Sequence, residues 1–240
     1  MKRDLLDMTF VIPVRVDSKE RKQNLKYCVE HLLENFNTNI ILVESDKIQK
    51  LKNYKDYSNV KLIFEKTNDL LFHRTHLLNL GFKEAKTPFV ANYDGDAYLN
   101  PEQIEFAVEM LRKGETQFII PYDGHCYEYM IGKGKLYLMN PCSVGGAFFA
   151  NKKDYEEIGY ENENFISWGH EDNERITRLL KFKKILKRTT GSFLHLCHPR
   201  GINSCDENPM IEENKKEHEK VTHMSLDELK KYVRSWKWLK

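Results

Sequence analysis

The sequence contains few cysteines, and their arrangement excludes the sites that cysteines most often build. Five occur in 240 residues, an odd number without a Cys-x-x-Cys pair, at Cys28, Cys126, Cys142, Cys197 and Cys205. A disulfide framework or a structural zinc site needs paired or closely spaced cysteines. We therefore expect free thiols and a reducing, cytoplasmic environment.

Segments that would place the chain in a membrane are also missing. Residues 1–7 carry alternating charges where a signal peptide has an apolar core. No apolar run approaches the roughly 20 residues that cross a bilayer. We therefore do not expect an integral membrane protein.

A strong net charge is absent as well. Lysines and arginines number 38 against 36 acids, for a formal charge of +2, so no nucleic acid or other polyanion is expected as a partner. Hydrophobic residues make up 40% of the chain, enough for a substantial core. No repeat or linker divides the chain, so we expect one domain over residues 1–240 with a helical tail from about residue 210.

Short apolar runs alternate with helical patterns in the first half of the chain. The expected strands are 8–14, 39–43, 60–64 and 87–93, and the expected helices are 18–35 (capped by Ser18), 72–85 and 101–113. This alternation predicts an α/β fold whose mostly parallel central sheet has helices on both faces. Ligands of such sheets bind beyond the carboxyl ends of the strands.

The second half is less regular. Strands are expected at 117–122 and 143–150, with a turn at 132–134 between two further strands, and short strands near 185 and over 193–197. A helix is expected over 171–181, and two charged helices follow residue 210.

Two carboxylates in the motif Asp94-Gly95-Asp96 follow the expected strand 87–93. The glycine permits a sharp turn. Carboxylate oxygens bind hard cations such as Mn²⁺ or Mg²⁺, which in turn bind substrate phosphates. An ordinary surface turn is the alternative, but the position at the end of a buried strand favours a metal site formed by acids exposed at a strand end.

The motif Trp168-Gly169-His170-Glu171-Asp172 leads into the helix expected over 171–181. Acids in the first turn of a helix interact favourably with its dipole. The alternative interpretation is therefore that the two carboxylates only stabilise the helix. That interpretation does not explain the tryptophan beside a glycine. Such a pair is suited to form a wall against which a sugar ring packs. The same dipole keeps a carboxylate such as Asp172 ionised at neutral pH, as a catalytic base requires.

Two histidines, His195 and His198, lie near the end of the strand expected over 193–197. Side chains three apart on a strand face opposite sides, so both reach one ion only if the strand ends between them. Pro199 and Gly201 indicate such an end. We therefore predict that these two histidines are also metal ligands. The alternative is that they are structural histidines held by hydrogen bonds.

Together these motifs resemble those of the β-1,4-galactosyltransferases, in that family's order, over about residues 8–205. The stretch Phe72-His73-Arg74-Thr75-His76-Leu77-Leu78-Asn79-Leu80-Gly81 resembles Phe-Asn-Arg-Ala-Lys-Leu-Leu-Asn-Val-Gly, and Ile12-Pro13-Val14-Arg15 resembles Ile-Pro-Phe-Arg. Asp94-Gly95-Asp96 corresponds to Asp-Val-Asp, Val144-Gly145-Gly146 to Phe-Gly-Gly, and the tryptophan motif to Trp-Gly-Gly-Glu-Asp. His195-x-x-His198-Pro199-Arg200 resembles Met-x-x-His-Ser-Arg.

The resemblance implies a GT-A fold, an inverting reaction, a UDP-sugar donor and Mn²⁺, with Mg²⁺ as an alternative. Asp172 would deprotonate the acceptor hydroxyl and Glu171 would bind the sugar. The metal ligands would be Asp96, His198 and, in place of the family's methionine, His195. The donor site would comprise Pro13, Arg15, Phe72, Arg74, Asp94, Gly146 and Trp168.

Departures from the family suggest where the protein works. Animal members have a membrane anchor and disulfides, and this chain shows neither. In this respect it resembles bacterial capsule and surface-polysaccharide transferases. We expect a cytoplasmic enzyme that moves a hexose or N-acetylhexosamine to a glycan or lipid-linked glycan. Ser143 replaces the tyrosine that precedes Phe-Gly-Gly in the family, so the donor pocket should have room for the acetamide of GalNAc as well as for galactose.

The tail offers one further hypothesis. Apolar residues recur at helical spacing at Leu229, Tyr232, Val233, Trp236 and Leu239, among the basic residues Lys230, Lys231, Arg234, Lys237 and Lys240. Such a helix either lies on the inner face of the plasma membrane or docks on the protein's own core.

Two other functions fit part of the sequence. A nucleotidyltransferase also uses paired acids and Mg²⁺, but residues 12–24 contain no glycine for its phosphate loop. A non-catalytic glycan-binding module would use aromatic residues such as Trp168 without transferring sugar.

Overall fold

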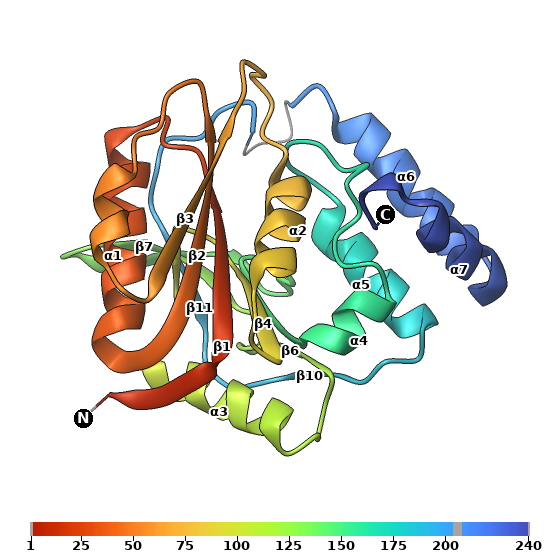
Figure 1. Ribbon diagram of the computed structural model, residues 1–240, viewed down its shortest axis with the longest axis horizontal. Coiled ribbons are helices and arrows are strands. Elements are labelled where there is room, and N and C mark those ends of the chain that lie inside the picture. The colour runs from red at the N-terminus through yellow and green to blue at the C-terminus, as the bar shows by residue number, and fades with distance from the viewer. Residues whose placement is uncertain (1, 204–207, 240) are drawn as a thin grey trace.

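The computed structural model describes residues 2–203 and 208–239, so Cys205 and Lys240 lie outside the described residues. Seven strands form the central sheet in the order β10-β6-β9-β4-β1-β2-β3 (Figure 1). Their bounds are β1 Arg3–Val14, β2 Phe36–Asp46, β3 Val60–Lys66, β4 Phe89–Tyr93, β6 Phe118–Ile120, β9 Ala147–Asn151 and β10 Leu186–Arg188. All neighbouring strands are parallel except β9, which is antiparallel to β4 and β6. The mostly parallel sheet is therefore confirmed.

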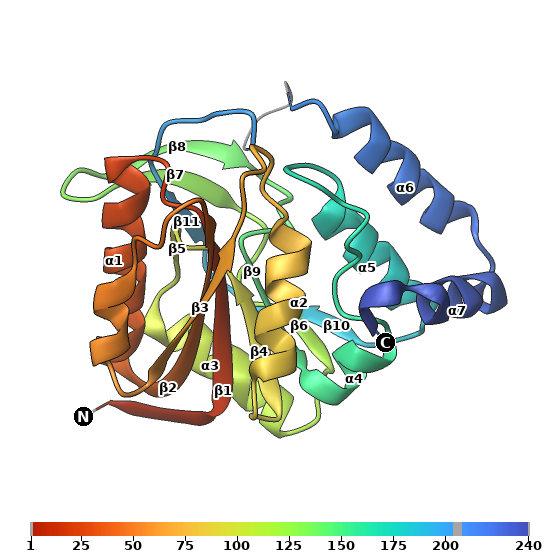
Figure 2. The same ribbon diagram turned by 45° about the horizontal axis from the view of Figure 1, so that its top comes forward.

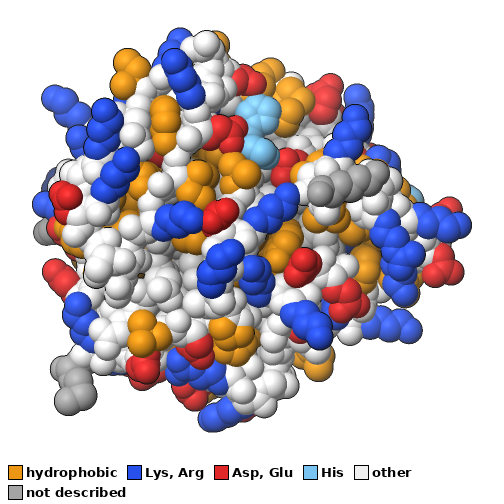
Figure 3. Space-filling view, in the orientation of Figure 1, with side chains coloured by type: hydrophobic (Ala, Val, Ile, Leu, Met, Phe, Trp, Pro, Cys, Tyr) orange, Lys and Arg blue, Asp and Glu red, His pale blue; other side chains and the backbone are white. Residues whose placement is uncertain are grey.

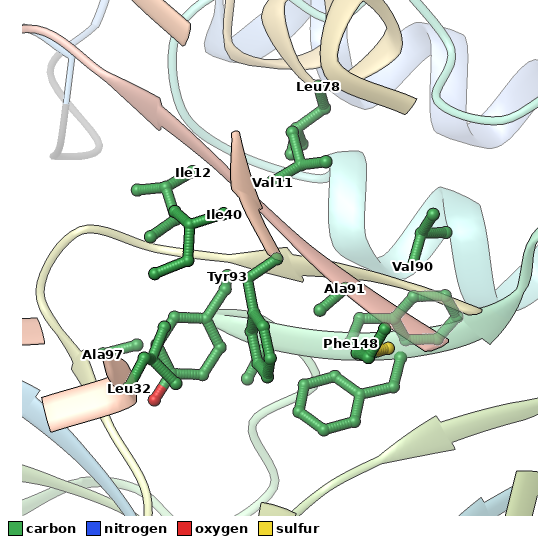
Figure 4. Close-up of a cluster of buried hydrophobic side chains, with 14 of the residues drawn as sticks. Val11, Ile12, Leu32, Ile40, Leu78, Val90, Ala91, Tyr93, Ala97 and Phe148 are labelled. Atoms are coloured by element: carbon green, nitrogen blue, oxygen red, sulfur yellow. The ribbon is translucent and has the colours of Figure 1, made fainter. Parts of the chain in front are cut away.

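Helices cover both faces of this sheet because neighbouring residues of the central strand β1 point to opposite sides. Val11 points towards Leu78 of α2 (Arg74–Glu84), whereas Ile12 lies beside Ile40 (Figure 4). The Ile12 face is covered by α1 (Lys19–Asn35), whose residue Leu25 lies with Ile12 against Gly95. The expected layers are confirmed, and they form one continuous hydrophobic core.

The remaining helices extend these layers. α3 (Pro101–Arg112) packs against β1, β6 and β9, and α4 (Lys152–Glu157) packs against β9. α5 (Glu171–Lys181) has the bounds expected from the sequence, and Ser18 caps α1 by accepting a hydrogen bond from the backbone N–H of Arg21 at 3.1 Å. α4 and the short 3-10 helix η1 (Lys52–Asp56) were not expected.

A second, four-stranded sheet was not predicted. Its order is β5-β11-β7-β8, with bounds β5 Ala97–Tyr98, β7 Cys126–Met130, β8 Gly134–Asn140 and β11 Phe193–Leu196. Figure 2 shows it beside α1. β11 lies between β5 and β7 and pairs Leu194 with Tyr98 and Phe193 with Cys126. Its partners therefore precede it by 96 (194 − 98) and 67 (193 − 126) residues, and sequence periodicity gives no information about such pairing. The expected turn at 132–134 does join two antiparallel strands, β7 and β8.

The strand expected over 143–150 is shorter than predicted. β9 begins only at Ala147, and residues 143–146 run irregularly along the edge of the sheet. Gly146 has φ +79°, a conformation that interrupts a regular strand. The glycine pair therefore precedes β9.

The C-terminal helices α6 (Ile211–His223) and α7 (Leu226–Ser235) pack beside α5 (Figure 1) and are followed by η2 (Lys237–Leu239). Leu229, Val233 and Trp236 are buried together with Val221. The membrane hypothesis for this tail is therefore wrong, because the protein's own core covers these apolar side chains. Within the described ranges, no helix has the length and hydropathy of a membrane span.

The surface is mixed in charge. On the face shown in Figure 3, Lys and Arg side chains alternate with Asp and Glu side chains. This agrees with the small net charge of +2 and gives no sign on this face of a surface built for a polyanion.

Candidate functional site

A cleft of about 770 Å³ opens where β1 and β4 end. Every residue predicted for the site lines it: Pro13, Arg15, Phe72, Arg74, Asp94, Asp96, Gly146, Trp168, Glu171, Asp172, His195 and His198. The carboxyl ends of parallel strands are where such folds bind ligands. The sequence-based site is therefore assembled in one place.

Asp96, His195 and His198 form a cluster with the geometry of a metal site. The turn after β4 brings Asp96 next to β5, and β11 pairs with β5 so that His195 lies opposite Ala97. Nε2 of His198 is 3.1 Å and Nε2 of His195 is 3.9 Å from Oδ2 of Asp96. All three ligand atoms lie within 4.8 Å of one another, close enough to share one ion.

The donor set fits a transition metal better than Mg²⁺. Mg²⁺ strongly prefers oxygen ligands, whereas two imidazoles and one carboxylate suit Mn²⁺ and related ions. Nδ1 of His195 is buried and has no hydrogen-bond partner among the described residues. Burial acts to raise the pKa of Asp96, but His195, His198 and Arg21 lower it well below its usual range, so this carboxylate stays charged.

Asp96 corrects one expectation. It was predicted as an exposed ligand at a strand end, but its exposed fraction is 8%. The small sheet and α1 cover it, with NH1 of Arg21 3.5 Å from its Oδ2. The sequence analysis missed Arg21 because it treated α1 only as an amphipathic helix.

Asn24 is a second missed residue on α1. It is buried, and its amide donates hydrogen bonds to the backbone carbonyls of Leu196 (3.1 Å) and Cys197 (3.0 Å). These bonds fix the chain between the two histidines. A polar residue on the buried face of α1 was the signal that could have revealed it.

Arg74 lies at the centre of the acidic side of the cleft. Its NH2 donates to Oδ1 of Asp94 at 2.7 Å and to Oδ1 of Asn92 at 3.0 Å. Its NH1 lies 3.9 Å from Glu171 and 3.8 Å from Asp172. One mostly buried cation therefore faces three carboxylates, one from the turn after β4 and two from α5.

Glu171 and Asp172 begin α5 but differ in environment. Oε2 of Glu171 accepts a hydrogen bond from the N–H of Gly169 at 2.8 Å, and burial, assisted by the charge of Asp172, raises the pKa of Glu171 to about 7. The Asp172 side chain is 22% exposed and receives a hydrogen bond from NH2 of Arg175 at 2.6 Å. Arg175 was missed by the sequence analysis.

Gly145 lies directly against the carboxylate of Asp172. A Cβ at Gly145 would be 2.2 Å from Oδ2 of Asp172, and a Cβ at Gly146 would be 2.4 Å from the ring of Phe193. The glycine pair therefore allows the backbone before β9 to approach both α5 and the small sheet.

Trp168 is 41% exposed in the cleft. Its loop is held by α6, because Asn214, which is fully buried, accepts from the N–H of Ile166 at 3.2 Å and donates to its carbonyl at 3.0 Å. The next residues are tightly constrained, since His170 has φ +69° and a Cβ at Gly169 would lie 2.5 Å from Ile211. The contribution of α6 to the site was not predicted.

Arg15 and Phe72 form the other end of the cleft. The Arg15 guanidinium lies 5.4 Å from the centre of the Phe72 ring and donates to the carbonyls of Ser45 (3.0 Å) and Leu70 (2.8 Å). Its NH2 is buried, and no residue in the described part of the chain forms a hydrogen bond with it. A cation and an aromatic ring held in this way suit a base or a phosphate.

Comparisons with known proteins agree with this geometry. The catalytic domain of Drosophila β1,4-galactosyltransferase 7 in complex with xylobiose superposes with a TM-score of 0.55 at 17% identity, over 94% of this chain and 83% of that one. A mutant of the same enzyme with manganese, UDP-Gal and xylobiose gives 0.59 at 18% identity, with the same coverage. Residues 1–349 of TarS from S. aureus in complex with UDP-GlcNAc give 0.56 at 12% identity, over 84% of this chain and 60% of that one.

These likenesses show the GT-A fold. A search of curated proteins by sequence finds no match. Two family profiles do match: one described as the N-terminal domain of galactosyltransferase covers residues 131–199, and that of glycosyl transferase family 2 covers residues 9–132, more than half of the chain. The chain belongs to glycosyl transferase family 2.

Proposed function

We propose that the protein is a metal-dependent, inverting glycosyltransferase that uses a UDP-sugar donor. The observation that carries this proposal is that one cleft holds both the Asp96, His195 and His198 cluster and the partly exposed carboxylate of Asp172. The first suits a diphosphate-bound cation and the second suits a base. Structures of the same fold that hold manganese with UDP-Gal, or UDP-GlcNAc, support the donor class.

The proposed reaction is a single displacement. Oδ2 of Asp172 takes the proton of the acceptor hydroxyl, and the acceptor oxygen forms a bond to the anomeric carbon from the face opposite the diphosphate. The bond between that carbon and the diphosphate oxygen breaks, and its electron pair leaves with UDP. A bound Mn²⁺ would supply electrostatic stabilisation of the leaving diphosphate.

Other residues would bind and orient the donor. Arg15 and Phe72 would hold the uridine end, and Arg74 would hold Asp94 in place beside the sugar. Trp168 would form an apolar wall for a sugar ring, and Glu171 would bind a sugar hydroxyl. Fixing both reactants in this way supplies much of the rate enhancement of a two-substrate reaction.

The sugar, the acceptor and the location are further parts of the proposal. We infer transfer of a hexose or N-acetylhexosamine to a glycan in bacterial surface polysaccharide synthesis, in the cytoplasm. The motif pattern supports the pathway class, and the four described cysteines, all of them free, are consistent with a reducing compartment. Drosophila β1,4-galactosyltransferase 7 binds xylobiose in its crystal structure, which supports a glycan acceptor.

UDP release is the direct test. The protein is incubated with UDP-Gal, UDP-GalNAc, UDP-Glc or UDP-GlcNAc, with and without Mn²⁺, and with a panel of oligosaccharides. We expect Mn²⁺-dependent release that Asp172→Asn lowers by about 100-fold or more while donor affinity is kept. A non-catalytic glycan-binding module would release no UDP under any condition, and loss of donor binding in Asp172→Asn would reassign that residue to substrate binding.

A further inference from the structure

We propose that Arg175 is a positioning residue for the catalytic base, holding Oδ1 of Asp172 so that Oδ2 is left for the acceptor hydroxyl. This inference rests on the proposed function, in which Asp172 is the base. It concerns a buried arginine that the motifs of the cleft do not include. Arg175 does not line the cleft and would act only through Asp172.

The carboxylate of Asp172 is confined from two sides. NH2 of Arg175, one helical turn along α5, donates to Oδ1 at 2.6 Å. The backbone of Gly145 lies against Oδ2, with no room there for a Cβ. The only other cation near Asp172 among the described residues is Arg74, whose NH1 is 3.8 Å from Oδ1 and outside hydrogen-bond distance.

Arg175 is itself fixed by a chain of buried contacts. Its NH1 donates to Oε1 of Glu161 at 2.7 Å, and the hydroxyl of Tyr155 donates to the same oxygen at 2.6 Å. Its guanidinium lies 4.3 Å from the centre of the Phe148 ring. Arg175 is fully buried, so contacts in the core fix its position. Arg175 in turn holds the carboxylate of Asp172.

Charged groups surround the carboxylate of Asp172. The titratable groups that face it, directly or through Arg175, are Arg74, Asp94, Tyr122, Tyr155, Glu161, Glu171 and Arg175. Among the described residues, only Arg175 makes an ion pair within hydrogen-bond distance of this carboxylate. Without that pair, attraction to Arg74 and repulsion from Asp94 and Glu171 should turn the carboxylate away from its present position.

Arg178 provides a matched control on the same helix. It is also fully buried, pairs with Glu174 at 2.9 Å, and lies 5.2 Å from the centre of the Trp236 ring. It does not contact Asp172 in the structure. If Arg175 has only a structural role, Arg175→Met and Arg178→Met should have similar effects on kcat. If Arg175 positions the base, only Arg175→Met should lower kcat.

The first experiment measures kcat and donor KM for the full chain with saturating Mn²⁺. Arg175→Met should lower kcat by about 10- to 100-fold at neutral pH and leave donor KM within about twofold. Arg175→Lys, which keeps a cation that can pair with Asp172, should restore part of kcat. Arg178→Met should leave kcat within about twofold of the wild-type value even if it lowers the melting temperature.

If Arg175→Met does not fold because a buried charge is lost, a double-mutant cycle still tests the proposal. Arg175→Lys, made alone and in the Asp172→Asn background, should cost activity only when Asp172 is intact. Equal losses in both backgrounds, or an unchanged kcat in Arg175→Met, would overturn the positioning role. Full activity of Asp172→Asn by itself would instead overturn the proposed base, so the two failures are distinguishable.

Discussion

A Cβ added at Gly145 would lie 2.2 Å from Oδ2 of Asp172, so the backbone before β9 directly limits where this carboxylate can point. Gly145→Ala should displace the carboxylate by about 1 Å or more and lower kcat by about 100-fold. The backbone of Gly145 is outside the left-handed region, so the substitution itself adds no conformational strain. Steady-state kinetics with circular dichroism separates lost turnover from lost folding.

Gly114→Ala, away from the cleft, is the control for this prediction. Among the described residues a Cβ at Gly114 meets nothing within 4 Å, and φ there is +66°. The substitution should therefore cost some stability through backbone strain but leave kcat within about twofold of the wild-type value. Unchanged kcat in Gly145→Ala would show that the acceptor does not depend on this position of Asp172.

The metal cluster makes a prediction about Mn²⁺ affinity. Because Asp96 is buried beside two histidines and Arg21, Asp96→Asn is the appropriate substitution, and alanine would also leave a cavity. Asp96→Asn and His198→Ala should each weaken Mn²⁺ binding by about 10- to 100-fold or more, measured by calorimetry and by the Mn²⁺ concentration at half-maximal rate.

His125→Ala is the histidine control for the metal prediction. His125 is exposed, pairs with Asp123 at 3.0 Å, and does not line the cleft. Its loss should leave the Mn²⁺ dependence unchanged. If His198→Ala binds Mn²⁺ as tightly as His125→Ala does, His198 is not a ligand.

The raised pKa of Glu171 makes stability depend on pH. Its folded pKa is about 7 against an ordinary value of 4.5. Between these values the unfolded chain has lost the proton that the folded protein still holds. The contribution of Glu171 to stability is therefore greatest below pH 4.5 and is lost as the pH rises through 7. Glu171→Gln removes this loss, so its melting temperature should gain on the wild type between pH 5 and pH 8.

Thermal unfolding at several pH values checks this behaviour. Glu213→Gln, at an exposed position of α6, serves as the control for a general effect of removing one charge. A difference between Glu171→Gln and wild type that stays constant from pH 5 to pH 8 would show that Glu171 ionises normally in the folded protein.

The donor pocket is the subject of the last prediction. Ser143 lines the cleft, and its Oγ lies 3.1 Å from the hydroxyl of Tyr122. The nearby Tyr137 of β8 does not line the cleft, so its bulky side chain does not occupy the space beside Ser143. We expect UDP-GalNAc to be used at least as well as UDP-Gal. Ser143→Tyr should overpack the pocket by about 1–3 kcal/mol for the bulkier sugar, or roughly 5- to 150-fold in relative kcat/KM.

Ser143→Ala should leave the donor preference unchanged, because it keeps the side chain small. The measurement is kcat/KM for both donors with one acceptor. A wild-type enzyme that clearly prefers UDP-Gal would contradict the prediction, whatever the effect of the tyrosine.

Local patterns predicted the parts of the fold that are stabilised locally. The alternation of apolar residues identified β1 to β4, and the acidic first turn of α5 gave that helix its observed bounds. The resemblance then selected the cleft residues, including His195 and Asp96, before any pairing of strands was known. These features depend on residues close together in the sequence or on contiguous motifs.

The missed features all depend on contacts between distant segments. The small sheet needs β11 between β5 and β7, the loop of Trp168 is held by Asn214, and Arg175 points into the core to meet Glu161. Arg175 follows charged neighbours on a helix with a high proportion of charge, so composition alone indicates a solvated face. Only the tertiary partners show that it is buried.

The strand order of the two sheets constrains the sequence of events as the chain is synthesised. β9 enters between β6 and β4, and β11 enters between β5 and β7, in each case between strands that leave the ribosome earlier. Contacts of such high sequence separation form late, since long loops must close first. His195 and His198 therefore reach Asp96 only once most of the chain has been made, so a nascent or truncated chain that ends before residue 195 lacks two of the three proposed metal ligands.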